Sequence, residues 1–223
     1  MESKRIAAER AVDYIQDGMI VGLGTGSTAY WAIQKIGERV KNGLNIKAIA
    51  TSNASDQLAR ELGIEIIEFK DIGSIDITID GADEVTPNLD LIKGGGGALL
   101  REKIVAAASK RLIIVIDESK LVVTLGKFPL PVEVVPFGYE MTLRKLQYLE
   151  CKVNLRMIAD NLYVTDNGNY IIDCNFETIV NPIELHTELN LITGVVDNGL
   201  FLDMANDVII GYMDGSIKEL TFK

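Results

Sequence analysis

"TIDGADEVTPNLDLIKGGGGALLREKIVAAASK", residues 78–110, is the stretch that decides the fold. It begins at the end of an apolar run typical of a buried strand and ends in a run whose apolar residues recur at helical spacing. Between the two runs lie acidic residues, a lysine and four consecutive glycines. In open α/β sheets, ligands bind beyond the carboxyl ends of the strands. The stretch therefore predicts both a strand-to-helix unit and a ligand site at its turn.

The same alternation of apolar and helical runs extends through the first half of the chain. Apolar runs occupy residues 19–24, 46–51, 64–69, 75–80 and 111–117, and helical patterns separate most of them. Near-continuous apolar strands alternating with helices are typical of a parallel sheet covered on both faces. We expect an α/β fold with a doubly wound, mostly parallel sheet.

The pattern changes after "GKFPLP", residues 126–131. A strand, a helix (139–150), a short strand (152–156), a hairpin around Asn167-Gly168 and a helix (182–192) follow. The order β-α-β-β-α-β indicates a second, smaller ferredoxin-like α+β domain. The tail, residues 207–222, reads as a hairpin that returns to the first sheet. We predict a Rossmann-like catalytic domain of residues 1–127 plus 197–223, and a small α+β domain of residues 128–196.

Composition narrows the class of protein. A chain of 223 residues that is 48% hydrophobic buries a substantial core, and its net charge of -10 argues against nucleic-acid or anionic-membrane partners. No apolar run approaches the roughly 20 residues of a membrane span, and no targeting signal is seen. Cys151 and Cys174 lack CxxC spacing and flanking histidines, so neither a metal site nor a disulfide framework is predicted. A cytoplasmic protein fits best.

The loop "GLGTGST", residues 22–28, suits a phosphate. Thr25, Gly26, Ser27 and Thr28 lead into a helix whose N–H groups and dipole favour an anion. The loop is neither a dinucleotide fingerprint, since Ser27 stands where a third glycine is needed, nor a P-loop, since it lacks the lysine. The alternative is an ordinary N-capped turn with glycines for tight packing.

Two carboxylates leave the strand at the start of the quoted stretch. Asp80, Gly81, Ala82 and Asp83 follow its apolar run, and Glu84 is next to them. The alternatives to a ligand-binding role are that these acids are turn or cap residues, or that they form a magnesium site.

Lys93 and the glycines that follow it, Gly94, Gly95, Gly96 and Gly97, favour an oxyanion instead. Glycines allow several backbone N–H groups to turn toward one bound oxygen.

Glu102 is the candidate general base. Its helical neighbours are Leu99, Val105 and Ala106, so we expect a partly buried carboxylate whose desolvation favours proton uptake. The alternative is a surface salt bridge or an acid favoured by the helix dipole. Lys120, after the apolar run 112–116, is a candidate ligand contact, with a solvated lysine as the alternative.

Taken together, these motifs resemble ribose-5-phosphate isomerase of the A type. "GLGTGST", "DGADE", "IKGGGGALLREK", "DESK" and "GKFPLPVEV" occur in the family's order, and the similarity extends over nearly all of the chain. The resemblance implies an aldose-ketose isomerase of the non-oxidative pentose phosphate pathway, a phosphorylated pentose substrate, no metal or organic cofactor, and a homodimer or homotetramer.

The resemblance also implies residue roles. Catalysis falls to Asp80, Asp83, Lys93 and Glu102, with Glu102 as the base. Substrate binding falls to Thr25, Gly26, Ser27, Thr28, Gly81, Ala82, Gly94, Gly95, Gly96 and Lys120, and Lys4 matches more loosely a lysine near the phosphate.

Two other classes of protein stay open at this point. A sugar-phosphate-sensing regulator would normally carry a DNA-binding module, for which this chain has neither spare length nor basic charge. A CoA-transferase relative would use a glutamate as nucleophile and form a covalent thioester.

Overall fold

The computed structural model describes residues 2–221, which form two compact units. The larger unit comprises residues 1–82, 101–121 and 203–223, and the smaller comprises residues 83–100 and 122–202. This division differs from the predicted domains in residues 83–100, 122–127 and 197–202. Short strands at residues 84–85, 91–92 and 200–201 pair with one another, and the Val122 N–H donates to the Val85 carbonyl. The predicted boundaries, as a statement about independent domains, stay a prediction.

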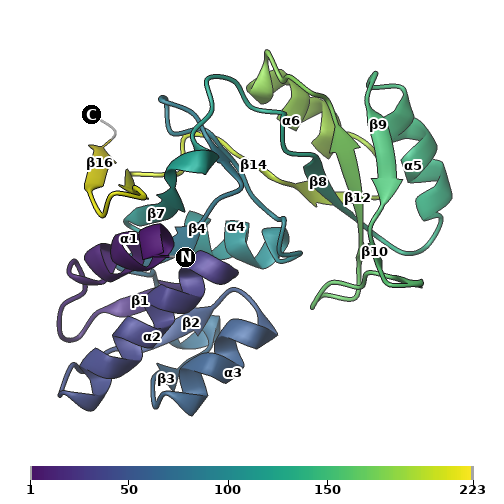
Figure 1. The fold of residues 1–223 in the computed structure, drawn as a ribbon. Coiled ribbons are helices and arrows are strands. Elements are labelled where there is room, and N and C mark those ends of the chain that lie inside the picture. Colours follow the sequence, from purple (N-terminus) through teal and green to yellow (C-terminus); the bar gives the residue numbers. More distant parts are fainter. Residues whose placement is uncertain (1, 222–223) are drawn as a thin grey trace. The chain divides into compact units, whose positions relative to one another are not determined.

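The larger unit is built on a seven-stranded sheet with the order β16-β15-β7-β4-β1-β2-β3 (Figure 1). Its strands are β1 (Ile20–Leu23), β2 (Lys47–Ala50), β3 (Glu65–Ile66), β4 (Ile77–Gly81), β7 (Leu112–Asp117), β15 (Asp207–Gly211) and β16 (Ile217–Thr221). All neighbours are parallel except β15 and β16. The doubly wound, mostly parallel sheet is confirmed, as is the returning C-terminal hairpin.

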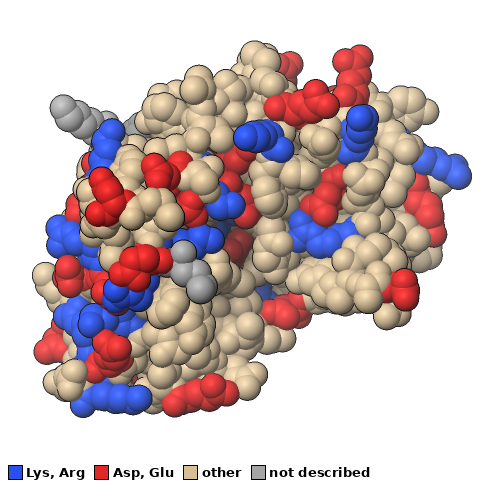
Figure 2. All heavy atoms as spheres, viewed as in Figure 1, with Lys and Arg blue, Asp and Glu red and all other residues tan. Residues whose placement is uncertain are grey.

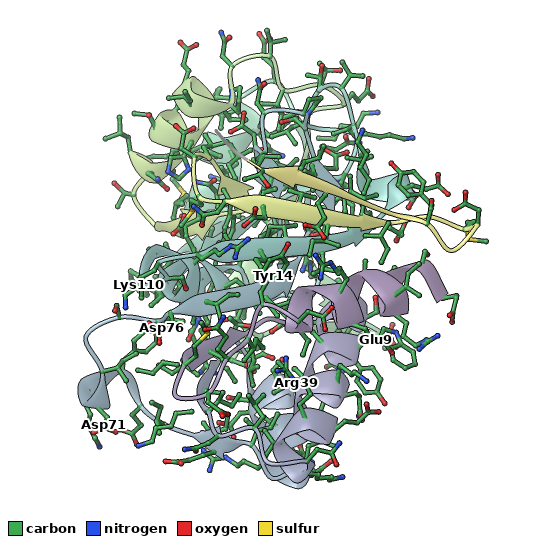
Figure 3. All side chains as sticks on the ribbon, turned by 90° about the vertical axis from the view of Figure 1, so that its left-hand side faces the viewer. Glu9, Tyr14, Arg39, Asp71, Asp76 and Lys110 are labelled. Atoms are coloured by element: carbon green, nitrogen blue, oxygen red, sulfur yellow. The ribbon has the colours of Figure 1, made fainter. Side chains whose placement is uncertain are left out.

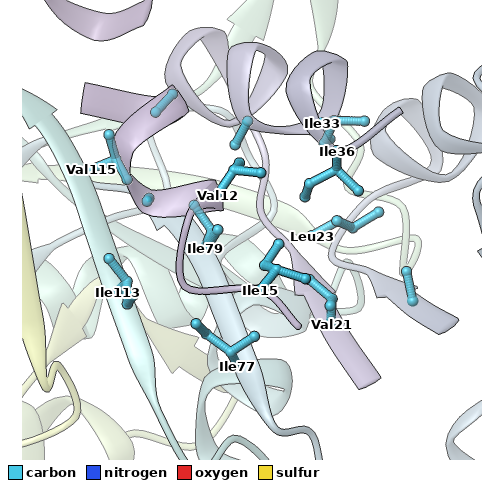
Figure 4. Close-up of a cluster of buried hydrophobic side chains, with 14 of the residues drawn as sticks. Val12, Ile15, Val21, Leu23, Ile33, Ile36, Ile77, Ile79, Ile113 and Val115 are labelled. Carbon is cyan, nitrogen blue, oxygen red and sulfur yellow. The ribbon is translucent and has the colours of Figure 1, made fainter. Parts of the chain in front are cut away.

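Helices cover both faces of this sheet. Successive residues of a strand point to opposite faces, and in these strands the residues on both faces are largely apolar. The helices are α1 (Glu2–Val12), α2 (Ser27–Lys41), α3 (Asn53–Glu61) and α4 (Leu99–Ala107), with short 3-10 helices η1 (Phe69–Asp71) and η2 (Glu118–Lys120). On one face, Val12, Ile33 and Ile36 pack on strand residues such as Leu23 and Ile79 (Figure 4). On the other face, Val105 of α4 packs with Ile49 and Ile75.

The N-terminal helix is held to the edge of the sheet by a ring of polar contacts. Tyr14, which follows α1, donates a hydrogen bond to Glu219 of β16 at 2.6 Å, and the guanidinium carbons of Arg10 and Arg111 lie 5.1 and 4.3 Å from its ring centre (Figure 3). Ala7 and Ala8 of this helix are fully buried, and their small side chains let the helix approach the strands closely.

The smaller unit has the predicted β-α-β-β-α-β order. Its main antiparallel sheet runs β13-β8-β12-β9, with β8 (Leu130–Val134), β9 (Lys152–Leu155), β12 (Tyr170–Asn175) and β13 (Val195–Asn198). Helices α5 (Tyr139–Gln147) and α6 (Pro182–Asn190) are the two crossovers. Leu146 and Leu189 from these helices are fully buried with Val132 and Ile172 of the sheet.

Two small antiparallel sheets complete this unit. One pairs β10 (Met157–Ile158) with β11 (Asn161–Leu162), and the other has the order β14-β6-β5, with β5 (Glu84–Val85), β6 (Leu91–Ile92) and β14 (Leu200–Phe201). The second sheet explains why residues 83–100 belong to this unit.

The charged side chains are of both signs and are interspersed over the face viewed in Figure 2. Among the helices described, none is long and apolar enough to cross a membrane.

Candidate active site

The predicted ligand loops of the larger unit meet at one edge of its sheet. Leu23 of β1 lies in register with Ala50 of β2 and with Ile79 of β4, and Gly81 of β4 lies in register with Val115 of β7. Parallel strands in register end on the same side, where the loops that follow them gather. These loops contain the motif of residues 22–28 that is predicted to bind phosphate, Asp80 and the "DESK" segment.

Asp80 joins the first loop to the exit of β4. Its carboxylate is 1% exposed, and Oδ1 accepts hydrogen bonds from the backbone N–H groups of Thr25, at 3.1 Å, and Gly81, at 2.7 Å. Gly24 permits this approach, because a Cβ atom there would lie 2.1 Å from Asp80 Oδ1. The glycine is therefore required by the carboxylate beside it.

A cluster of hydroxyl groups fixes the side chain of Thr25. Its Oγ1 lies 2.6 Å from Thr51 Oγ1 and 2.8 Å from Ser52 Oγ, and Ser55 donates to the Gly24 carbonyl at 2.6 Å. Thr51, Ser52 and Ser55 belong to none of the sequence motifs described above. Ser52 carries a usable signal, since it caps α3 by accepting from the Ser55 N–H.

Helix α2 directs its N-terminus into the same loop. Gly26 has a φ of 102°, and α2 begins at Ser27. In the described chain, no side chain caps this helix end, so the side-chain-capped turn considered above is not formed. Thr28 is buried, and a Cβ atom on Gly81 would lie 3.7 Å from Thr28 Cβ.

Two lysines influence Asp117 at this edge. Lys4 Nζ on α1 is 3.2 Å from Ser27 Oγ and 3.7 Å from the Asp117 carboxylate. Burial opposes ionisation of Asp117, yet hydrogen bonds from Ser119 and the charges of Lys4 and Lys120 together hold its pKa below its usual value. Lys4, a loose match in sequence, thus contacts the loop of residues 22–28, called the phosphate loop below after its predicted ligand. Asp117 carried no signal in the sequence analysis.

An apolar hollow of about 460 Å³ opens beside the phosphate loop. Thr25 and Ser27 line one part of it, and Trp31 and Leu58 line another. Tyr30 and Trp31 meet edge to face with ring centres 5.4 Å apart, an arrangement typical of packed aromatic side chains.

Glu102 lies in the first turn of α4 and is only 5% exposed. The expectation of a buried carboxylate is confirmed, and its place in the first turn also agrees with an acid favoured by the helix dipole. The residue before it, Arg101, donates to the side chain of Asn53 at 2.9 Å. This bond ties the start of α4 to the start of α3, at the edge where the ligand loops gather.

In the smaller unit, Asp83 and Lys93 border the glycine loop. Asp83 Oδ2 accepts from the Gly95 N–H at 2.7 Å. Lys93 is 2% exposed, its N–H donates to the Gly199 carbonyl at 2.9 Å, and Nζ lies 5.5 Å from the centre of the Phe201 ring. Burying a charged lysine costs free energy unless other groups pair with its charge.

Glu84 has a structural role. Its buried carboxylate accepts hydrogen bonds from the N–H groups of Gly126, at 2.7 Å, and Phe128, at 2.6 Å, and so fixes the "GKFPLP" segment. Of the three acids in "DGADE", this one has a structural role, but it lies in strand β5 and not in a turn.

Residues 2–221 contain neither a metal-binding cluster nor a disulfide. No group of three or more His, Cys, Asp and Glu in this range could hold a metal ion, and both cysteines are free. On α6, His186 pairs with Asn190 of the same helix and with Asn198 of β13, at 3.1 Å from each.

Residues 47–215 match the model of the family ribose 5-phosphate isomerase A (phosphoriboisomerase A). The chain belongs to this family. It is 57% identical to the ribose-5-phosphate isomerase A of Bacillus cereus over 221 residues, covering 99% of this chain and 100% of the relative. It is 49% identical to that of Oceanobacillus iheyensis, covering 95% of each.

Solved structures of the ribose 5-phosphate isomerase A family have the same fold. The isomerase of Plasmodium falciparum is similar with a TM-score of 0.96 at 42% identity, covering 99% of each chain. A D-ribose-5-phosphate isomerase solved in complex with phospho-erythronic acid is similar with a TM-score of 0.95 at 43% identity, covering 99% of this chain and 98% of the other.

Proposed function

We propose that the protein interconverts D-ribose 5-phosphate and D-ribulose 5-phosphate. The observation that carries the proposal is family membership over 99% of the chain, with Glu102 buried at the start of α4. The substrate would be the phosphorylated pentose in its open-chain form.

The reaction moves one proton between carbons. The base removes the proton from carbon 2 of the aldose as the carbon 1 carbonyl oxygen takes up negative charge, which gives an enediolate. The proton is then returned to carbon 1, while the hydroxyl proton of oxygen 2 passes to oxygen 1 and carbon 2 becomes the carbonyl. No net oxidation occurs, and no other reactant is needed.

We assign proton transfer to Glu102. General-base catalysis by a positioned carboxylate typically contributes about 10²- to 10⁴-fold. Burial of Glu102 supports this role, because a carboxylate that is shielded from water is a stronger base toward a carbon-bound proton.

We assign stabilisation of the developing oxyanion to Lys93 and the N–H groups of Gly94 and Gly96, while the Gly95 N–H positions Asp83. A lysine that is 2% exposed, followed by a loop free of side chains, suits an anion that exists only transiently. Asp80 and Asp83 would hold the substrate hydroxyls and assist ring opening, with Gly81 and Ala82 lining the same turn.

We assign the phosphate to Thr25, Gly26, Ser27 and Thr28 with the N-terminus of α2. Lys4 supports the assignment by its contact with Ser27, and Lys120 supplies a further positive charge. Binding energy from the phosphate would hold the sugar in place while the reaction proceeds at its other end.

The proposed setting is the non-oxidative pentose phosphate pathway of the cytoplasm. A homodimer or homotetramer without metal or organic cofactor is the proposed form of the enzyme. Size measurement by light scattering would distinguish the two assemblies.

Direct assay tests the proposal. Purified protein is incubated with D-ribose 5-phosphate, and D-ribulose 5-phosphate is followed by its absorbance; catalytic formation of the ketose is the expected result. Mass spectrometry of the protein after incubation with an acyl-CoA is the companion measurement. A covalent glutamyl thioester together with no ketose would establish the CoA-transferase alternative, and phosphopentose binding without turnover would establish the sensor alternative.

A further inference from the structure

The carbonyl oxygens of the glycine loop are held by two side chains from elsewhere in the smaller unit. Arg156 Nη1 donates to the carbonyl of Gly94 at 2.9 Å and to that of Gly95 at 3.2 Å. The hydroxyl of Tyr163 donates to the carbonyl of Gly96 at 3.4 Å. Three successive peptide groups of the loop are thus bonded on their carbonyl side.

These bonds fix where the N–H groups point. In a trans peptide, the carbonyl of one residue and the N–H of the next lie on opposite sides of the chain. The bond from Arg156 to the Gly95 carbonyl therefore turns the Gly96 N–H away from Arg156. Gly95 and Gly96 are exposed, and among the described residues no hydrogen bond uses the Gly96 N–H as its donor.

Arg156 is itself held rigidly. Its Nε donates to Asp173 Oδ2 at 2.9 Å, and Nη2 donates to Oδ1 of the same carboxylate. Its backbone N–H donates to the Ile171 carbonyl at 2.8 Å. One edge of the guanidinium is bound to Asp173 in the bidentate manner that fixes its plane, and the remaining donor is directed at the loop.

Tyr163 lies next to Arg156 and against the last glycine. Its backbone N–H donates to the Arg156 carbonyl at 2.9 Å, and the guanidinium carbon lies 5.8 Å from its ring centre. A Cβ atom on Gly97 would lie 2.0 Å from the Tyr163 hydroxyl oxygen. Close packing of the phenol therefore explains why the fourth residue of the loop is a glycine.

A buried glutamate on β8 anchors the turn that follows Tyr163. Glu133 is fully buried, and its Oε1 accepts from Thr165 Oγ1 at 3.0 Å and from the side-chain amides of Asn169, at 2.9 Å, and Asn167, at 3.3 Å. The segment that carries Tyr163 is thus tied to the central sheet of the unit.

We propose that Arg156 and Tyr163 are positioning residues for the isomerisation. They hold the carbonyls of residues 94–96, and the bond from Arg156 to the Gly95 carbonyl orients the Gly96 N–H in advance toward the enediolate oxygen. Hydrogen bonding to a peptide carbonyl also polarises the peptide and strengthens its N–H as a donor. This inference rests on the proposed function and assigns a role to side chains that do not themselves touch the reacting atoms.

Arg156→Met and Tyr163→Phe test the proposal, because each keeps the bulk of the side chain and removes its donors. Loss of one oxyanion donor typically costs roughly 10²- to 10³-fold, so we expect a positioning defect to lower kcat by about 10- to 10²-fold in Arg156→Met and by severalfold in Tyr163→Phe. KM should change by less than about twofold. Arg156→Lys, which retains a donor but not the fork, should recover part of the lost kcat.

Inhibition separates positioning from general damage. Phospho-erythronic acid has a carboxylate that resembles the planar, charge-delocalised enediolate, whereas inorganic phosphate occupies only the phosphate site. The inhibition constant for phospho-erythronic acid should rise in parallel with the loss of kcat, and that for phosphate should stay constant. Asp173→Asn combined with Arg156→Met should lower kcat little further than Arg156→Met alone, because both changes release the same guanidinium.

Matched controls are available in the same unit. Arg144 on α5 is exposed, and Tyr170 on β12 packs on Tyr139 with ring centres 5.3 Å apart. Arg144→Met and Tyr170→Phe should keep wild-type kcat and inhibition constants. A purely structural role would lower the melting temperature of Arg156→Met while leaving its kcat per folded molecule and its inhibition constants unchanged, and that result would overturn the proposal. A wild-type protein without isomerase activity would instead reject the proposed function itself.

Discussion

Thr25 donates its backbone N–H to the carboxylate of Asp80 at 3.1 Å, so the exit of β4 fixes the loop that follows β1. The two residues are distant in sequence and meet because their strands are neighbours in a parallel sheet. An acid proposed to hold substrate hydroxyls is thereby coupled to a loop proposed to hold the phosphate. The coupling requires Gly24, over which the carboxylate lies.

Gly24→Ala should therefore damage both activity and folding. The new Cβ would lie 2.1 Å from Asp80 Oδ1, so Asp80 or the loop must shift. We expect a fall of at least about 10-fold in kcat/KM and a loss of about 1 to 3 kcal/mol in the free energy of unfolding, as is usual for overpacking. Gly73→Ala is the control, since nothing lies within 4 Å of its Cβ position. Equal activity in the two variants would refute the coupling.

Thr28→Ala should affect binding more than turnover. Thr28 lies in the first turn of α2, in the loop assigned to the phosphate. Its proposed role is in substrate binding and not in proton transfer. We expect KM for D-ribose 5-phosphate to rise severalfold while kcat changes little, measured by steady-state kinetics. Thr178→Ala, at an exposed position of the smaller unit, should leave both constants unchanged. An unchanged KM with a collapsed kcat would contradict the phosphate assignment.

Asp76→Asn should destabilise the protein at neutral pH but not in acid. A hydrogen bond from the Ile20 N–H and then the ion pair with Lys110, at 2.8 Å, lower the pKa of Asp76 (Figure 3). Because the pKa is lowered on folding, the ionised carboxylate stabilises the fold at pH values above its unfolded-state pKa, which is about 4. This contribution is lost as the pH falls through the folded-state pKa. We expect a deficit of about 1 kcal/mol at pH 7 that shrinks toward zero near pH 2, measured by urea unfolding.

Asp71→Asn serves as the control for this pH dependence. Asp71 is exposed in the neighbouring 3-10 helix, apart from Asp76 in Figure 3. Its substitution should shift the urea midpoint little at any pH. A deficit for Asp76→Asn that stayed constant down to pH 2 would show that the lost contact is not the ionised carboxylate.

Sequence patterns predicted the fold well where structure is local and periodic. Apolar runs ending in polar residues gave the parallel strands, and the order of elements gave the ferredoxin-like unit. The hairpin around Asn167-Gly168 was only partly right: Thr165 and Asn169 do close a turn, but the preceding residues 161–162 pair with β10 rather than with β12. Pairing partners depend on tertiary contacts such as those of Glu133, which no local pattern reveals.

The candidate site shows the same limit. Glycine runs and strand-end acids identified Asp80, Asp83, Lys93 and the phosphate loop as candidates, because backbone freedom and charge are unusual beside apolar runs. Arg156 and Tyr163 carry no such mark in sequence. They reach the glycine loop only because the sheet of the smaller unit brings residues 156–163 beside it.

Glu102→Gln should abolish most turnover while leaving the fold and substrate binding intact. Glutamine keeps the size of the side chain at this buried position but cannot accept a proton at the reaction's pH. We expect kcat to fall by at least about 10²-fold, the lower bound for general-base catalysis, with a melting temperature close to that of the wild type. The exchange of the carbon-bound substrate proton with deuterated solvent, followed by NMR, should stop as well.

The control for Glu102→Gln is Glu61→Gln, at an exposed position near the end of α3. It removes the same charge from the same unit and should leave turnover and exchange at wild-type levels. If Glu102→Gln retained near-normal isomerisation and exchange, another carboxylate would be the base. Asp80 and Asp83 would then be the groups to test, each by substitution with asparagine. Asp80→Asn would also weaken the hold on the N–H groups of Thr25 and Gly81, an effect that Asp83→Asn would not have.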